Sequence, residues 1–562
     1  MSAGALDAAI AARLSGWERE RVAERLWERD GSLWAASGKP PDEVAKWLGW
    51  LDLPDTMRVR AVELQHLARD VAADGYASAA VLGMGGSSLA PELFSRVFGG
   101  PLGAPDHATG LELRVLDSTH PDVVRGFRSW AEAGRTLFCV SSKSGSTTEP
   151  NAFHAAMAGF APALDFVAIT DPGSSLAEVA RAQEFRAIVD GEPDVGGRYS
   201  ALSVFGLVPA ALHGVDLDAL LDRATDMAEE CRRPAGQNPG LQLGAAIGEA
   251  ALAGRDKLTF FTSPRLASFG DWAEQLIAES TGKAGTGIVP VVGEPAADPD
   301  AYGHDRAFVI MQLASEADPA LAKLAAGLAA AGHPTWEFQL SDALAVGGEF
   351  FRWEVATAAA GIVLGIDPFD QPNVQESKDA TRALLETYRS GGSLPGPGPL
   401  VAEPGVTAYG DPEALGDAPV TVDGALRALL ASVAQGDYLG ILAYLPMDQA
   451  YAPLQRLRAH IGRGLGVATT LGFGPRFLHS TGQLHKGGPA SGVFLQLTAE
   501  PMRDLPIPGW EESFGTLIAA QALGDFQSLQ RRGRRVLRLH LHDLEAGLAR
   551  IEGIIGADIR LN

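Results

Sequence analysis

Short apolar runs that alternate with stretches of helical spacing fill most of the chain from residue 78 onward. A first series ends near residue 190, and a second covers about residues 257 to 340. The runs read SAAVLGM, LELRVLD, TLFCVSS, DFVAITD and FRAIVDG, and then KLTFFTS, GTGIVPVV, AFVIMQLA and TWEFQLS. This alternation is typical of parallel strands whose sheet is covered by helices on both faces. Each series therefore predicts one α/β unit.

Helical spacing precedes the first series, and a third α/β pattern follows the second. The segment 390–405, SGGSLPGPGPLVAEPG, is dense in Pro and Gly and marks a boundary. Beyond it, YLGILAYLP, GVATTLGFG, GVFLQLT and VLRLHLH predict strands, with helices over 450–463, 512–531 and 543–555. The predicted organisation is a helical lead-in (1–60), a first α/β domain (61–235), a second α/β domain (236–390), a Pro/Gly linker (391–405) and a C-terminal α/β domain (406–562).

Charge and cysteine content exclude several classes of protein. A net charge of −23 opposes non-specific binding to nucleic acid and to acidic membranes, so an anionic ligand would need a local cationic site. Cys139 and Cys231 cannot form a disulfide framework or a cysteine zinc site, and we expect buried free thiols. The N-terminus lacks a signal-type core, and no apolar run reaches about 18 residues. We expect a cytoplasmic protein.

A glycine-rich turn joins the first predicted strand to a helix within AAVLGMGGSSLAPEL, residues 79–93. Glycines let the backbone approach an anion closely, and hydroxyls at a helix N-terminus favour negative charge. We take Gly86, Ser87 and Ser88 as candidate phosphate-binding residues. A plain strand-to-helix turn is the alternative, since the third glycine of a dinucleotide fingerprint and the P-loop lysine are both missing.

A second polar turn follows the strand TLFCV and reads SSKSGSTTEP. Hydroxyls, backbone amides and one lysine at a helix start suit the three oxygens of a phosphate without a metal ion. The candidate phosphate-binding residues here are Ser142, Lys143, Ser144 and Thr147. A Ser/Thr-rich helix cap is the alternative, but two such turns after neighbouring strands favour a ligand at the carboxyl edge of the sheet.

Five motifs in a fixed order resemble the phosphoglucose isomerase family: GMGGSS, SSKSGSTTEP, GGRYSALSVFGL, AESTGK and FDQPNVQESK. The resemblance covers about residues 60 to 390. It is nearest to the isomerase half of bacterial transaldolase–phosphoglucose isomerase fusions, which also carry the HSTGQLHKGG segment found here at 479–488. It implies tandem sugar-isomerase (SIS) type three-layer αβα domains with parallel sheets, here followed by a C-terminal α/β domain. We expect no transaldolase barrel, and a separate transaldolase is a compatible companion.

The resemblance also implies roles for single residues. Glu279 of AESTGK matches the catalytic base, and Arg198 is the arginine of the GGR motif. Gln275 matches a substrate-site glutamine, and Lys378 matches the lysine that helps to open the sugar ring. Taken singly, each has a structural alternative: a surface ion pair for Arg198, a helix-surface acid for Glu279 and a solvated lysine for Lys378.

The ring-opening histidine departs from the family order. Family members place it between the base and the lysine, where this chain has only His304 and His333, outside the family motif. LHSTGQ at 478–483 resembles the histidine segment, so His479 is the candidate, with His485 nearby. In typical members the neighbouring subunit donates this histidine. The C-terminal domain would take its place here, so both a monomer and a homodimer are compatible.

These residues together predict an enzyme that interconverts glucose 6-phosphate and fructose 6-phosphate through an enediolate. One carboxylate can move a proton between C2 and C1, and an arginine can stabilise the enediolate oxygen, so neither a cofactor nor a metal is needed. The alternatives are a non-catalytic module that binds a sugar phosphate for regulation and an isomerase for another phosphorylated sugar. A sensor would need neither Glu279 nor Lys378, which favours the enzyme.

Overall fold

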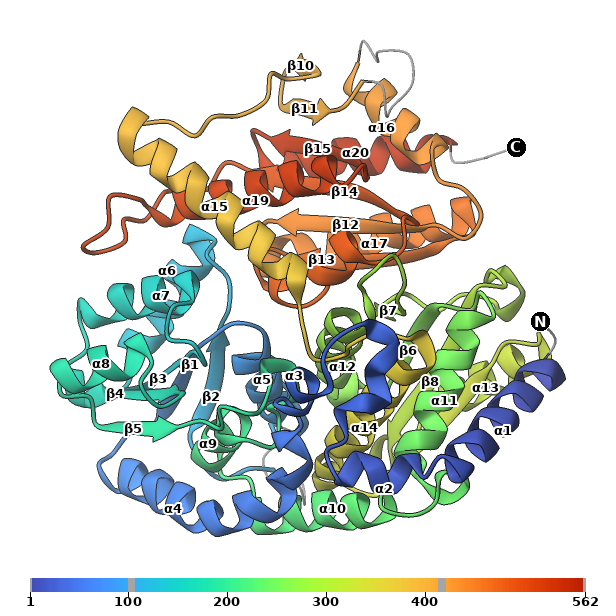
Figure 1. Ribbon diagram of the computed structural model, residues 1–562. Helices are drawn as coiled ribbons and strands as arrows, with labels where there is room; N and C mark the ends of the chain where they lie inside the picture. Colours follow the sequence, from blue (N-terminus) through green and yellow to red (C-terminus); the bar gives the residue numbers. More distant parts are fainter. Residues whose placement is uncertain (1–2, 100–106, 413–420, 559–562) are drawn as a thin grey trace.

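The computed structural model describes residues 3–99, 107–412 and 421–558, and three β-sheets lie within these ranges. The sheets of strands β1–β5 and β6–β9 lie side by side, and the sheet of β10–β15 lies above both (Figure 1). The first two sheets are parallel throughout, and helices pack around all three. The predicted α/β fold with parallel sheets is therefore confirmed.

The first sheet carries both polar turns at one edge. Its strands run in the order β2 (Glu112–Leu116), β1 (Ser78–Leu82), β3 (Thr136–Ser141), β4 (Phe166–Thr170) and β5 (Ala187–Asp190). Every residue of β1, β3 and β4 is buried, as expected for a sheet that is covered on both faces. Leu82 pairs with Leu116 and with Val140, so the turns that follow these strands meet at the carboxyl edge. The helices of this unit are α5 (Leu89–Val97), α6 (Pro121–Glu132), α7 (Thr148–Ala158), α8 (Ser175–Ala182) and α9 (Val204–His213).

The second sheet supports the helix that carries Glu279. Its strands run in the order β7 (Val289–Val292), β6 (Lys257–Thr262), β8 (Arg306–Leu313) and β9 (Thr335–Leu340). Its helices are α10 (Leu217–Glu230), α11 (Pro239–Leu252), α12 (Ala267–Thr281), α13 (Pro319–Ala330) and α14 (Val346–Leu364). Helix α12 follows β6, so its residues start from the carboxyl edge of this sheet.

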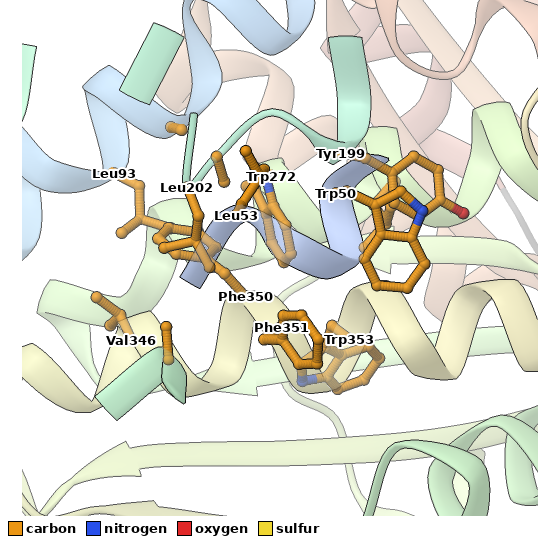
Figure 2. Close-up of a cluster of buried hydrophobic side chains, with 14 of the residues drawn as sticks. Trp50, Leu53, Leu93, Tyr199, Leu202, Trp272, Val346, Phe350, Phe351 and Trp353 are labelled. Atoms are coloured by element: carbon orange, nitrogen blue, oxygen red, sulfur yellow. The ribbon is translucent and has the colours of Figure 1, made fainter. Parts of the chain in front are cut away.

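The N-terminal helices are part of the core rather than a separate appendage. They are α1 (Ala3–Arg19), α2 (Val22–Trp27), α3 (Pro41–Ala45) and α4 (Leu53–Ala73). Trp50, between α3 and α4, packs with Tyr199 and Phe351 at ring-centroid distances of 5.2 and 5.8 Å (Figure 2). Aromatic pairs of this kind add to the stability gained from burial. Since Tyr199 directly follows Arg198, this core fixes the turn that carries the arginine.

The third sheet is mixed. Its strands run in the order β10 (Val401–Glu403), β11 (Val406–Gly410), β15 (Arg535–Leu541), β14 (Gly492–Ala499), β12 (Tyr438–Tyr444) and β13 (Ala468–Phe473). The four predicted strands, β12 to β15, are parallel, whereas β10 and β11 were not predicted and form an antiparallel edge. The helices are α15 (Pro372–Gly391), α16 (Val422–Ala431), α17 (Met447–Leu465), α18 (Gly482–Gly487), α19 (Phe514–Arg531) and α20 (Leu544–Asp558).

Two further expectations meet the structure here. Cys139 and Cys231 are free and buried, which confirms the thiol prediction. Among the described residues, no helix combines the length and the apolar character that crossing a membrane would need. The predicted domain boundaries stay predictions, because strand order alone does not divide a chain into independent units.

Candidate active site

The first glycine-rich turn packs directly against two other parts of the site. Gly85 has a φ of 55°, and a Cβ atom there would lie 2.8 Å from Nε2 of Gln275 and 3.0 Å from the carbonyl oxygen of His479. A Cβ atom on Gly86 would lie 1.9 Å from the carbonyl oxygen of Gly197. No side chain fits at either position, so the glycines allow the turn to touch the second sheet's helix and the Arg198 turn.

The two serines of this turn differ in their surroundings. Ser88 is fully buried, and its hydroxyl donates to the carbonyl oxygen of Gly85 at 3.1 Å. Ser87 is 8% exposed, and its hydroxyl makes no hydrogen bond within the described ranges. Ser88 therefore stabilises the turn, and Ser87 keeps a donor for a ligand.

The second polar turn has a network of hydroxyls and a paired lysine. Ser142 Oγ bonds Thr147 Oγ1 at 3.2 Å, and the hydroxyls of Ser144 and Ser146 lie 3.0 Å apart. Lys143 Nζ pairs with Asp171 Oδ2 at 2.7 Å and also donates to a backbone carbonyl. The lysine charge is thus largely neutralised within the protein, and since Ser142 donates to Thr147, the donors left for a ligand are the Thr147 hydroxyl, one of the Ser144 and Ser146 hydroxyls, and the helix-start amides.

Arg198 lies in the turn η5 (Gly197–Tyr199) and is only 3% exposed. Its Nε donates to Ser280 Oγ at 2.7 Å, and its Nη1 donates to Gln371 Oε1 at 2.7 Å. Its Nη2 donates to the backbone oxygens of Pro368 and Asp370 at 2.6 and 3.1 Å. A guanidinium stays charged even when buried. The structure therefore fixes a permanent positive charge here, and the surface-ion-pair alternative is wrong.

Glu279 and Gln275 lie one turn apart on α12 and are 7% and 4% exposed. Glu279 Oε2 lies 3.7 Å from Arg198 Nη1 and accepts a hydrogen bond from Gln275 Nε2 at 3.2 Å. The helix-surface alternative for Glu279 is therefore wrong. A buried carboxylate beside a fixed cation can take up a proton while the cation stabilises the negative charge that develops on a neighbouring oxygen.

A buried lysine holds the loop that contacts Arg198. Lys283 Nζ donates to the carbonyl oxygen of Asp367 at 2.8 Å and pairs with Asp370 Oδ1 at 2.8 Å. Burial and then the neighbouring Arg198 lower the pKa of Lys283 to about 8. Lys39, from the N-terminal region, also pairs with Asp370 at 3.2 Å. The loop that leads into α15 is therefore anchored from two sides.

His479 reaches this group from the C-terminal unit. It ends the turn η11 (Arg476–His479), which follows β13, and its carbonyl oxygen accepts from Gln275 Nε2 at 2.8 Å. Its Nε2 lies 3.0 Å from Oε1 of Glu149, in the first turn of α7. Burial disfavours the charge on Glu149, but His479, a backbone hydrogen bond and the charge of Lys378 together hold the pKa of that carboxyl below its usual value. The imidazole is therefore held by a carboxylate within the same chain.

Arg476 ties this turn to the other two sheets. Its guanidinium pairs with Glu92 of α5, lies 3.2 Å from Asp117 Oδ2 after β2, and lies 3.7 Å from Asp271 Oδ2 of α12. Three carboxylates from two units thus surround one arginine from the third. This contact places His479 beside Gln275 and Glu149.

The remaining predicted residues lie at the rim or elsewhere. Lys378 is exposed on α15, which agrees with the alternative that this lysine is solvated. Its charge nevertheless helps to lower the pKa of Glu149. His304 lies in a separate cleft of about 1270 Å³ between the second and third sheets. His333 is buried against Phe308, with ring centroids 5.3 Å apart. Neither histidine lies among the partners of Glu279.

His485 and Lys486 are buried in the C-terminal unit. His485 packs against Phe494 with ring centroids 4.9 Å apart, and burial lowers its pKa. Lys486 Nζ pairs with Asp525 Oδ1 at 2.7 Å, and both side chains are 1% exposed or less. These two buried residues of α18 therefore anchor the segment that follows His479.

Sequence reasoning missed three residues of the site. Gln371 bonds Arg198, Gln521 bonds Glu149, and Glu149 itself was not among the predicted site residues. Gln371 lies in the FDQPNVQESK motif, so its position carried a signal. Gln521 lies 372 residues from Glu149, and no local pattern could have pointed to it.

Curated relatives decide the family. A glucose-6-phosphate isomerase of Rubrobacter xylanophilus is 29% identical over 424 residues, which cover 66% of this chain and 94% of that protein. A probable glucose-6-phosphate isomerase of Natronomonas pharaonis is 31% identical over 358 residues, which cover 56% of this chain and 81% of that protein. The chain belongs to the glucose-6-phosphate isomerase family. It is an aldose–ketose isomerase, as its motifs predicted.

The fold of this chain is similar to that of a solved glucose-6-phosphate isomerase structure. The crystal structure of a glucose-6-phosphate isomerase from Chlamydia trachomatis is 17% identical, with a TM-score of 0.53, and the match covers 68% of this chain and 86% of that one. At this identity the likeness concerns the fold alone. No protein-family model matches the chain.

Proposed function

We propose that the chain interconverts glucose 6-phosphate and fructose 6-phosphate through an enediolate, with Glu279 as the base. The arrangement of Glu279, 3.7 Å from Arg198 and 3.2 Å from Gln275, carries the proposal. The base takes the proton from C2 and returns it at C1, and Arg198 stabilises the enediolate oxygen. The choice of sugar is supported by the two relatives, a glucose-6-phosphate isomerase and a probable one.

The phosphate group is bound by the two polar turns. Ser87, Ser144 and Thr147 offer hydroxyls, and the first turns of α5 and α7 offer backbone N–H groups, whose dipoles favour an anion. Gly86 and Ser88 shape the first turn, and Ser142 shapes the second by donating to Thr147. Lys143 adds positive charge to the second turn, reduced by its pairing with Asp171 at 2.7 Å.

Ring opening is assigned to His479, assisted by Lys378 at the rim. An imidazole can exchange a proton with the ring oxygen near neutral pH. The 3.0 Å contact between His479 and Glu149 within one chain supports a site that is complete in a monomer, and a homodimer is equally compatible. A cytoplasmic location and a separate transaldolase as companion belong to the same proposal.

A coupled assay that follows glucose 6-phosphate formation from fructose 6-phosphate tests the proposal. We expect turnover with these two sugars and much slower turnover with amino-sugar phosphates or other epimers. Preferred turnover of another phosphorylated sugar would replace the substrate but keep the chemistry. Tight binding of sugar phosphates without turnover of any would favour the regulatory module instead.

A further inference from the structure

Gln521 joins the C-terminal unit to the first sheet through both ends of its side-chain amide. It lies on α19 and is 2% exposed. Its Nε2 donates to Glu149 Oε1 at 2.7 Å, and its Oε1 accepts from the hydroxyl of Thr119 at 2.7 Å. Thr119 is fully buried and follows β2. Both polar ends of the amide are therefore satisfied by the unit that carries Glu149.

His479 contacts the same oxygen of Glu149, Oε1. Nε2 of His479 lies 3.0 Å from Glu149 Oε1, so the histidine and the glutamine converge on one atom. An ionised carboxylate accepts hydrogen bonds and donates none. The NH₂ group of Gln521 therefore faces Glu149, and the Thr119 hydroxyl, which can donate or accept, donates to the amide oxygen. The ionised carboxylate of Glu149 thus determines the orientation of the amide.

We infer that Gln521 is a positioning residue, which keeps Glu149 ionised and aligned with His479 while His479 exchanges a proton with the sugar ring. It acts through Glu149 and does not itself need to touch the sugar. A donor to the charged form of a carboxylate stabilises that form. The inference rests on the role proposed for His479 and extends it to a residue with no counterpart among the motifs.

Other groups near Glu149 also affect its protonation. His479 from η11 and Lys378 from α15 favour its charged form. Tyr444 of β12 is fully buried, and burial raises its pKa far above the working range, so it stays neutral. Gln521 is thus a neutral side-chain donor to Glu149, whereas His479 and Lys378 carry or can carry positive charge. Its loss removes a hydrogen bond without changing the charge of the site.

Two variants test the inference. In Gln521→Leu, Glu149 loses a donor, so its pKa should rise and the acidic limb of the kcat/KM profile should move by about one unit to higher pH. We expect kcat for the cyclic sugar to fall about 10-fold with KM nearly unchanged, since a hydrogen bond to a charged group is lost. In Gln521→Glu, the new carboxyl can share a proton with Glu149. This variant should keep near-normal turnover at low pH. As the pH rises and the shared proton dissociates, the variant should lose turnover, whereas wild type should not.

Matched controls separate positioning from folding. Gln496, also fully buried, bonds Asp525 and the carbonyl oxygen of Ala522 in the same unit, away from Glu149. Gln496→Leu should lower stability without moving the acidic limb. Thr119→Val removes the donor to the amide oxygen of Gln521, so the amide is held less firmly, and the limb should move in the same direction as in Gln521→Leu, by less.

The outcomes divide clearly. An unmoved acidic limb in Gln521→Leu, or identical pH profiles for Gln521→Leu and Gln521→Glu, would overturn the positioning role. If His479→Ala leaves turnover of the cyclic sugar intact, the role proposed for His479 fails first. If His479→Ala impairs that turnover and the Gln521 variants behave as wild type, the positioning role alone fails.

Discussion

Nε2 of His479 lies 3.0 Å from Oε1 of Glu149, although 330 residues separate the two in the chain. One comes from the unit of the third sheet and the other from the unit of the first. The contact holds only while these units stay docked. Activity that depends on His479 therefore reports on the packing of the whole chain.

Replacement of Glu279 by glutamine should nearly abolish turnover and leave ligand binding intact. The amide keeps the size and hydrogen-bonding capacity of the side chain but cannot take up the proton. Loss of a positioned base costs about 10² to 10⁴-fold in rate. Steady-state kinetics and a binding titration with fructose 6-phosphate measure both effects. Glu337→Gln, an exposed acid on β9, serves as control. A rate above about a tenth of wild type would exclude Glu279 as the base.

Replacement of His479 by alanine should slow turnover of the cyclic sugar more than turnover of an open-chain substrate. The open-chain form bypasses ring opening, and alanine cannot exchange a proton. We expect a loss of about 10²-fold with the cyclic sugar and a loss several-fold smaller with an open-chain analogue. His304→Ala, in the separate cleft, should change neither rate. Equal losses on both substrates would mean that His479 acts at another step.

Replacement of Arg476 by methionine should loosen the C-terminal unit. Arg476 contacts Glu92, Asp117 and Asp271, and its removal leaves these carboxylates close together, with the exposed Arg96, 3.9 Å from Glu92, as the remaining ion-pair partner in the described part of the chain. We expect the melting temperature to fall by several degrees and turnover of the cyclic sugar to fall with it. Arg456→Met removes an exposed pair with Glu552 and should leave the melting temperature unchanged. Equal melting temperatures for the two variants would contradict the docking role.

Stability should depend on pH through Lys283. Its pKa is lowered by burial, from 10.5 to about 8, so between these values the unfolded chain holds a proton that the folded chain has lost. The free energy of unfolding should therefore rise with pH in this window, by up to about 1.4 kcal/mol per unit. Urea unfolding at several pH values, for wild type and Lys283→Met, isolates this contribution, because the difference between the two should grow from pH 8 to pH 10. Lys323→Met, at an exposed position, should give a difference that does not vary with pH.

Chelation should leave the isomerase active. Hydroxyls, backbone amides and Lys143 provide the donors for the phosphate dianion, so a divalent ion is not needed for its charge. Activity measured after exhaustive dialysis against EDTA should stay within about two-fold of the starting value, since the dialysis removes none of these donors. Activity that disappears and returns with one added metal would show that the phosphate site is organised differently.

Local patterns predicted the strands and turns well, because each depends on neighbouring residues. The turns at Gly85 and Ser142 follow buried strands whose apolar runs are plain in the sequence. Strands β10 and β11 were missed, since both are short, and β10 lies within the Pro/Gly segment 390–405, which carries no periodicity, while β11 directly follows it. Motif resemblance, rather than periodicity, singled out Arg198 and Glu279.

Pairings across the chain could not be predicted in the same way. Lys143 was a candidate phosphate-binding residue in SSKSGSTTEP, and its pairing with Asp171 after β4 was not predicted. Glu149 was not among the predicted site residues, but His479 and Gln521 both bond it. A side chain at the carboxyl edge of a sheet meets residues from several units, and the sequence alone does not tell which of them it meets.

The docking of the His479 turn through Arg476 has a consequence for how such enzymes diversify. A site that is closed by docked units does not depend on the order in which its parts are encoded. A histidine segment that follows Lys378 in the chain can lie beside Gln275. A histidine segment that precedes Lys378 in the chain would occupy the same position. Gene rearrangement can thus permute the linear order of the motifs while selection preserves the geometry, and homologues of this kind are better recognised by the spatial set of their residues than by the sequence of their motifs.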